Sequence, residues 1–376
     1  MSSKDENIFS KESLMTTEAG KDIMKQAAFH SKSYKQFQHY KEKSEAEFPR
    51  FLKRFVTDLY SQIKNDQNSA STLAAFIEEV SVTELSLESS KITDVKARLS
   101  DLDTLTDRVR RILNSNYVKM TYPVFHALLD GANSYLKLQV SSELKDELID
   151  GHMIAIDLSE PMDRIVDKDE DLEYLNDYKL MNPYILNIAR MKISKAGDAV
   201  LKSFEQGFKD ARVGQHVDYK LKLEPSSITD EKMVECYKKY RAVMGTAGKN
   251  MALSKEPLAE IFYLGMARAG ESVGCGNEIE DSLKNNSIKV PSWPLYYAIN
   301  TNDVKKAFEL TMNKSDLYLE DARIALEMLP DDFETKPFLD FLFLTVRHYN
   351  QFWYNELKKA NPFDRFGQKL SAIVKN

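Results

Sequence analysis

Basic residues and aromatic rings alternate along residues 190–255, where fourteen Lys and Arg stand against eight Asp and Glu. A single-stranded polynucleotide is bound by cations that follow its phosphates and by flat side chains on which its bases stack. This stretch offers both, so we expect its side chains to contact phosphates and bases. The residues to which we assign these contacts are Arg190, Lys192, Lys195, Arg212, Tyr237, Lys238, Lys239, Tyr240, Arg241 and Lys249.

The same stretch has a simpler interpretation, in which the cations cover two solvated helix faces and the rings belong to the core. Tyr237 and Tyr240 fit either interpretation. A second basic and aromatic stretch, residues 21–64, holds ten Lys and Arg against five Asp and Glu. The position of 190–255 supports the binding interpretation, because this stretch spans a predicted domain boundary, where a groove would form.

Residues 245–250, with the sequence GTAGKN, resemble a phosphate-binding loop in composition alone. A P-loop carries G-x-x-x-x-G-K-[ST], whereas Val243 stands here at its first glycine and Asn250 at its final hydroxyl residue. Gly245 then either ends a helix or belongs to a backbone turn that binds an anion beside Lys249. The sequence leaves both possibilities open.

Familiar catalytic and metal-binding patterns are missing from the sequence. The acidic run 167–171 begins like an EF-hand loop, but Leu172 and Tyr178 stand where the glycine and the glutamate of that loop belong. The six histidines are scattered, and two cysteines are too few for a structural zinc site. No G-x-S-x-G elbow is present. We therefore expect no catalytic residue, no metal and no cofactor, and we predict that the protein is not an enzyme.

The low content of glycine and proline predicts the fold class. Thirteen glycines and eleven prolines among 376 residues indicate an all-α protein. Since single cores seldom exceed about 250–300 residues, the length predicts two helical lobes. Alternating apolar residues indicate one short strand near 216–223. The segments we expect are a flexible arm at 1–20, an N-terminal lobe at 21–213, a linker at 214–228, a C-terminal lobe at 229–362 and a flexible arm at 363–376.

The two terminal arms carry too few apolar residues to form cores of their own. Such segments commonly bind in a groove of a partner. We expect Ile8 and Phe9 of the first arm, and Phe363 and Phe366 of the second, to insert into neighbouring subunits of a homo-oligomer. No apolar run approaches the roughly 18–20 residues of a membrane span, so we expect no membrane partner.

The layout of two helical lobes, a basic hinge region at 190–255 and two terminal arms resembles that of nucleocapsid proteins of negative-strand RNA viruses. Coat proteins of flexuous plant viruses share much of this layout. The resemblance implies a nucleoprotein that polymerises and encapsidates single-stranded genomic RNA in a basic groove between its lobes. It also implies a location in the virion and the host cytoplasm. The alternative is a helical interaction or scaffold protein that binds no nucleic acid.

Overall fold

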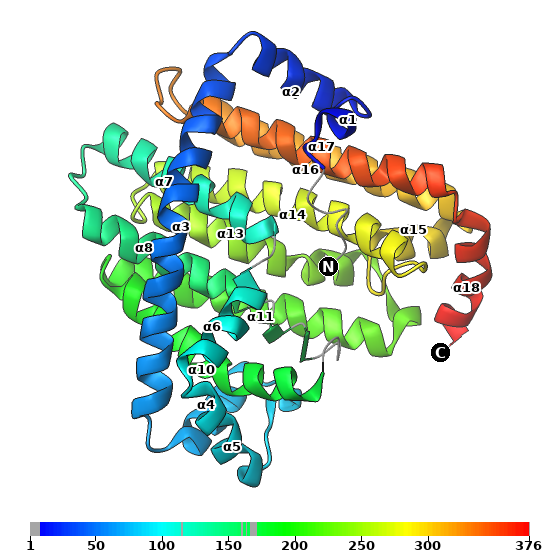
Figure 1. The fold of residues 1–376 in the computed structure, drawn as a ribbon. Helices are drawn as coiled ribbons and strands as arrows, with labels where there is room; N and C mark the ends of the chain where they lie inside the picture. The colour runs from blue at the N-terminus through cyan, green and yellow to red at the C-terminus, as the bar shows by residue number, and fades with distance from the viewer. Residues whose placement is uncertain (1–7, 114–115, 159–160, 163, 166–170, 376) are drawn as a thin grey trace. The chain divides into compact units, whose positions relative to one another are not determined.

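The computed structural model describes residues 8–113, 116–158, 161–162, 164–165 and 171–375, and within these ranges every regular element is a helix (Figure 1). The prediction of an all-α fold is confirmed. The helices group into two compact units that interleave along the chain. Unit 1 takes residues from 1–39, 130–137 and 202–376, and unit 2 takes residues from 40–129 and 138–201. The sequence predicted two lobes that are each continuous in the chain, joined by a linker. That division of the chain remains a prediction.

Unit 2 has a core formed by one face of a long helix and by the helices that follow it. Phe51, Phe55 and Leu59 are buried on that face, as their spacing predicts. Pro49 lies inside this helix rather than at its start. The elements that contribute to unit 2 are α3 (Lys32–Asn65), α4 (Ser69–Val80), the 3-10 turn η2 (Thr83–Leu85), α5 (Ser89–Leu99), α6 (Leu102–Leu113), α7 (Asn116–Leu136), α8 (Ser142–Asp157) and α10 (Leu172–Ser194).

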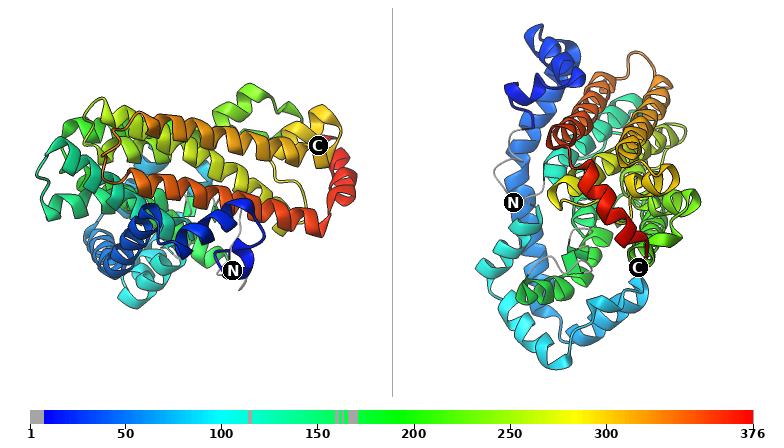
Figure 2. Two further views of the ribbon diagram at one scale, coloured as in Figure 1. Left: turned by 90° about the horizontal axis from the view of Figure 1, so that it is seen from above. Right: turned by 90° about the vertical axis from the view of Figure 1, so that its right-hand side faces the viewer.

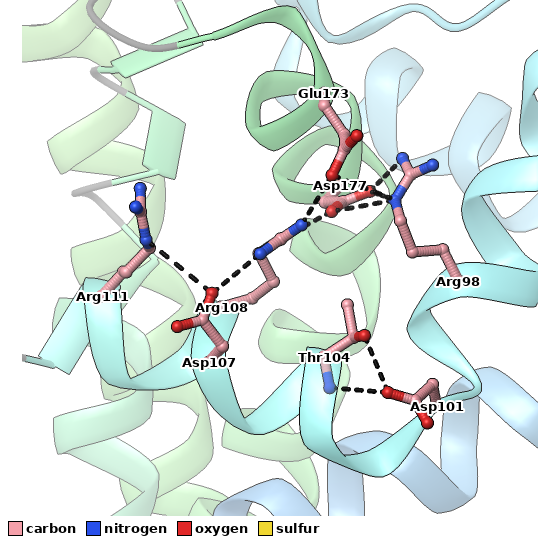
Figure 3. A network of polar contacts seen from close by, with 8 residues as sticks. All are labelled: Arg98, Asp101, Thr104, Asp107, Arg108, Arg111, Glu173 and Asp177. Carbon is pink, nitrogen blue, oxygen red and sulfur yellow. Dashed lines mark hydrogen bonds and ion pairs between the residues drawn. The ribbon is translucent and has the colours of Figure 1, made fainter.

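The amphipathic stretch 93–113, which reads as one helix, is broken into α5 and α6. Asp101 stands at the break, and its carboxylate accepts hydrogen bonds from the backbone N–H and the hydroxyl of Thr104 at 2.8 and 2.7 Å (Figure 3). An aspartate in this position satisfies free donors at the first turn of a helix. The apolar period continues through the break, so the spacing alone would indicate a single helix.

Unit 1 contains most of the remaining helices. Helices α14, α16 and α17 run alongside one another in both sets of views (Figures 1 and 2). The beginning of α3 and the end of α7 also belong to this unit. Its other elements are α1 (Lys11–Leu14), α2 (Glu18–Ala28), α11 (Asp198–Leu223, from Lys202), the 3-10 turn η3 (Pro225–Ser227), α12 (Asp230–Cys236), α13 (Lys238–Met251), α14 (Leu258–Lys284), α15 (Trp293–Thr301), α16 (Val304–Glu327), α17 (Lys336–Ala360) and α18 (Phe363–Lys375).

The glycines of the GTAGKN segment allow α13 and α14 to pack closely. A Cβ atom added to Gly248 would lie 2.8 Å from the carbonyl oxygen of Phe262, and one added to Gly245 would lie 2.8 Å from the ring of Tyr263. Both glycines lie inside α13. Gly245 therefore does not end a helix, and the segment is not an anion-binding turn, because residues 245–250 are the last part of α13.

Two expectations about local structure are wrong. Residues 216–223 form the end of α11 instead of a strand, since Val217 and Leu221, which are one helical turn apart, both pack on the same apolar core. The segment 363–376 is not a loose arm, because residues 363–375 form α18. The described part of the first arm, residues 8–20, is folded as well and contains α1 and the start of α2.

Candidate functional site

Three of the cations assigned to phosphate lie in unit 2 and pair with acidic side chains of that unit. Arg190 forms an ion pair with Glu79. Lys192 and Lys195 share the carboxylate of Glu147, at 3.2 and 2.6 Å. Their charges are therefore compensated within the chain.

The remaining predicted cations lie in unit 1, and most of them are compensated in the same way. Arg212 is half-buried on α11. Lys239 reaches the buried Asp218, which lies one short helix and a turn earlier in the chain. The ion pairs are Lys238–Glu235 (3.5 Å), Lys239–Asp218 (2.8 Å), Arg241–Glu271 (2.6 Å) and Lys249–Glu256 (3.2 Å).

The two predicted stacking tyrosines belong to the core of unit 1. Tyr237 is buried, and its ring lies 5.2 Å from that of Tyr240 and 5.7 Å from that of Trp293. Burial raises the pKa of the Tyr237 phenol well above its ordinary value. Tyr240 is half-buried against the same core, so packing within the chain accounts for both rings.

The apolar side chains expected to enter neighbouring subunits contact their own chain. Ile8 is buried in the core of unit 1, and its carbonyl oxygen lies 2.8 Å from Nε2 of His348. The ring of Phe9 lies 5.3 Å from the same imidazole. Phe363 and Phe366 pack around Phe308, with ring centroids 6.2 and 6.1 Å away. Contacts within one chain already account for these side chains, and their insertion into another subunit remains a prediction.

A buried carboxylate on α14 collects two arginines. Glu271 is fully buried; one of its oxygens accepts hydrogen bonds from Nε and Nη2 of Arg241 at 3.0 and 2.6 Å, and the other accepts one from Nη1 of Arg268 at 2.8 Å. Both arginine side chains remain about one-third exposed. Arg268 also lies 3.4 Å from the exposed carboxylate of Asp321. The buried acid fixes the arginines while leaving part of each open to solvent.

The ring of Tyr318 on α16 lies beside Arg268, and Lys314 lies between this ring and that of Trp293 on α15. The Arg268 guanidinium lies 5.6 Å from the centre of the Tyr318 ring, and the Lys314 ammonium lies 5.5 Å from the same centre. Lys314 also stands 3.8 Å above the ring of the buried Trp293. Cations are attracted to the faces of such rings. Among the described residues, Lys314 has no carboxylate partner, so its charge is held by rings alone. We call the group Arg241, Arg268, Lys314, Trp293 and Tyr318 the cation–ring cluster.

A second buried acid, Glu278, lies further along α14 than Glu271. Glu278 is buried and accepts a hydrogen bond of 3.0 Å from the backbone N–H of Trp293. Burial raises the pKa of this carboxyl to about 8, although Tyr237, Lys289 and Lys239 act in the opposite direction. The raised pKa favours the protonated form of Glu278 at neutral pH. Buried acids with displaced pKa values are common at functional sites.

Unit 2 contains its own buried carboxylate, Asp177 (Figure 3). We assign no ligand to it, because its charged neighbours are paired with one another. Asp177 accepts hydrogen bonds from Nε of Arg98 at 3.0 Å and from Nε of Arg108 at 2.7 Å. Arg108 also binds Glu173 at 3.0 Å and Asp107 at 2.8 Å. With Arg111, which lies 3.8 Å from Asp107, three arginines face three acids in this network. The cation–ring cluster, in contrast, carries three cations against one buried and one exposed carboxylate.

Sequence reasoning selected Arg241 but missed the rest of this cluster. Arg268 and Lys314 lie outside the basic stretch 190–255, and Glu271 reaches Arg241 from thirty positions away. Trp293 was notable only for its position between two prolines. A contact between α13, α14 and α16 cannot be derived from spacing within one helix, so no sequence signal combined these residues.

The sequence matches no known protein family and no curated protein. Its fold matches solved structures at low sequence identity. A geranyltranstransferase from Methanosarcina mazei is 15% identical, covers 76% of this chain and 96% of its own, and has a TM-score of 0.53. A decaprenyl diphosphate synthase from Rhodobacter capsulatus is 12% identical over 77% and 99%, with a TM-score of 0.53. A polyprenyl synthase from Caulobacter crescentus, complexed with calcium and isoprenyl diphosphate, is 11% identical over 78% and 97%, also at 0.53.

A divalent cation accompanies the ligand in the last of these structures, so we tested whether this chain could hold one. Such an ion is bound by several oxygen ligands, mostly carboxylates. The described residues contain no group of three or more His, Cys, Asp or Glu side chains that could do so. Glu271 and Asp218 are instead occupied by Arg and Lys. The described donor set does not fit a metal, and the acidic residues 167–170 lie outside the described part of the chain.

The shared fold corrects the functional expectations from the sequence. The matching structures are named as synthases and a transferase, so the resemblance to viral nucleocapsid proteins is wrong. The expectations that fall with it are encapsidation of single-stranded RNA, a location in the virion or host cytoplasm, the scaffold alternative and the absence of enzymatic activity. The chain has the all-helical fold of polyprenyl synthases.

Proposed function

We propose that this protein is an enzyme that binds an isoprenyl diphosphate and acts on it, with the diphosphate held at the cation–ring cluster. The observation that carries the proposal is the meeting of Arg241 and Arg268 on Glu271, beside Lys314, in a chain with this fold. The ligand named for the Caulobacter crescentus neighbour supports the choice of substrate class.

The cluster is suited to a diphosphate because of its charge and geometry. Guanidinium groups donate paired hydrogen bonds to phosphate oxygens, and an ammonium adds a compact charge. Arg241 retains Nη1 and Arg268 retains Nη2 outside the hydrogen bonds to Glu271. Because Glu271 holds both side chains in place, little conformational entropy is lost when an anion binds.

The rings suit the organic part of the same substrate. When an allylic diphosphate ionises, its C–O bond breaks, the electron pair leaves with the diphosphate, and the carbon chain becomes a cation. The faces of Trp293 and Tyr318 attract the ammonium of Lys314, so positive charge is already stabilised at this place. The arginines would stabilise the charge that develops on the departing diphosphate.

Lys314 offers the cleanest variant, because its loss leaves no described carboxylate unpaired. We expect wild-type protein to bind geranyl diphosphate in isothermal titration calorimetry, in buffer with Mg²⁺ and in buffer with EDTA. Lys314→Gln should weaken binding about tenfold, the usual effect of losing a charge-assisted hydrogen bond. Lys305→Gln, an exposed lysine of the same helix, is the matched control and should bind like wild type.

Two results would overturn the proposal. One is an absence of binding heat for both geranyl and farnesyl diphosphate with folded protein. The other is equal affinity in wild type, Lys314→Gln and Lys305→Gln, which would place the ligand elsewhere. Circular dichroism of each variant confirms that the helices are retained.

A further inference from the structure

The turn between α2 and α3 presents an aromatic side chain to solvent. Phe29 is 84% exposed, more than any other large hydrophobic side chain in the described part of the chain. It stands at the end of α2, and His30 follows with φ of 46°, a left-handed conformation that turns the chain sharply. An apolar ring in this position gains nothing from the core of its own chain.

Hydrogen bonds and ring contacts anchor the residues that follow Phe29. The hydroxyl of Ser31 accepts a hydrogen bond from the backbone N–H of Tyr34 at the first turn of α3. Tyr34 and Phe37 then pack on α17, with ring distances of 5.7 Å from Tyr34 to Phe341 and 4.8 Å from Phe37 to Phe341. The base of α3 is therefore anchored within unit 1.

Two lysines line a hollow of about 530 Å³ formed by the residues that follow Phe29. Its lining consists of His30, Lys32, Lys35, Gln36 and His39, and it includes no carboxylate. Among the described residues, neither Lys32 nor Lys35 forms an ion pair. This is the part of the basic stretch 21–64 that the proposed function leaves without a role.

We infer that the α2–α3 turn docks the protein on an anionic lipid surface, with Phe29 entering the headgroup region and Lys32 and Lys35 contacting lipid phosphates. Peripheral membrane sites combine exposed apolar side chains with Lys and Arg that face acidic headgroups. A free phosphate would account for the cations but not for the exposed ring. This inference concerns a surface of unit 1 that is separate from the cation–ring cluster.

The mode of docking is peripheral. No helix in the described part of the chain has the length and apolar character needed to cross a bilayer. The inference departs from the expectation that the protein has no membrane partner, which rested only on the search for spanning segments. An exposed ring beside lysines indicates a peripheral membrane contact, and only the folded chain shows which rings are exposed.

Co-sedimentation of the full chain with vesicles tests the inference. We expect binding to phosphatidylcholine vesicles that contain 30% phosphatidylglycerol, weak binding to pure phosphatidylcholine, and loss of binding as NaCl rises from 50 to 500 mM. Each lysine near such a surface contributes about a fivefold factor, so Lys32→Gln with Lys35→Gln should weaken partitioning about 25-fold. Phe29→Ser should weaken it as well, and 10 mM inorganic phosphate at constant ionic strength should not displace the protein.

Matched control variants distinguish the effect of this surface from a general effect of losing positive charge or an apolar side chain. Lys202→Gln with Lys209→Gln removes two exposed lysines from α11, and Leu317→Ser removes a side chain that is 66% exposed on α16. Both should bind like wild type. Equal binding to neutral and anionic vesicles, or an equal loss in the control variants, would overturn the inference. Displacement by inorganic phosphate would show that the turn is a site for the free anion instead.

Discussion

Replacing Glu278 by glutamine should change how the stability of the protein depends on pH. Burial raises the pKa of this carboxyl to about 8, from an ordinary value of 4.5. The native state therefore keeps a proton that the unfolded chain releases between these pH values. The resulting stability is fully present below pH 4.5 and is lost as pH rises through 8. At about 1.4 kcal/mol per pH unit, the loss amounts to about 5 kcal/mol over the whole interval and about 3 kcal/mol by pH 7.

Glutamine preserves the shape of Glu278 and an acceptor for the backbone N–H of Trp293, but it does not ionise. We expect Glu278→Gln to be more stable than wild type at pH 7, by up to about 3 kcal/mol, and to converge with it near pH 5. Urea denaturation of both proteins at half-unit intervals from pH 5 to 8 measures this difference. Glu327→Gln, at an exposed position of α16, is the control and should follow wild type. Parallel curves for Glu278→Gln and wild type would refute a proton held on Glu278.

Three further predictions concern packing and buried charge. Asp177→Asn should lower the free energy of unfolding by about 3 kcal/mol, because two arginines lose their shared carboxylate; urea denaturation measures it, and a loss under 1 kcal/mol would contradict it. Gly245→Ala should cost about 1–3 kcal/mol and lower Tm, since the new methyl group meets Tyr263, whereas Gly265→Ala, with its nearest atom at 3.6 Å, should cost nothing; equal Tm values would contradict this account. Burial lowers the pKa of His348, so stability should fall as pH drops below about 6.5, and less so in His348→Asn; thermal melts at pH 5 and 7 decide it.

Those features of the fold that depend on neighbouring residues follow local sequence rules. Thr229 caps α12 through its side chain, as expected of a threonine before an acidic turn. Asn361 ends α17 in a left-handed conformation just before a proline. The strand near 216–223 was a wrong prediction because four apolar residues at alternate positions also satisfy a helix that is partly buried. Packing against the core decided between the two periods.

The site could not be predicted because its residues meet only in the folded chain. The excess of Lys and Arg in 190–255 was real, but acids from other helices compensate most of it, as Glu271 does for Arg241. Charge counted along the sequence does not show which cations remain available. Lys314, the cation held by rings alone, lies in a part of the sequence with no basic excess.

The central claim is that this chain acts on an isoprenyl diphosphate, and ³¹P NMR of farnesyl diphosphate incubated with the purified protein and Mg²⁺ tests it most directly. A second incubation that also contains isopentenyl diphosphate tests transfer of the farnesyl group to a second substrate. The account predicts that the two ester diphosphate resonances decline while inorganic diphosphate appears, and that Lys314→Gln slows this conversion more than Lys305→Gln does. Unchanged resonances in both arms, with protein that remains folded throughout, would contradict it.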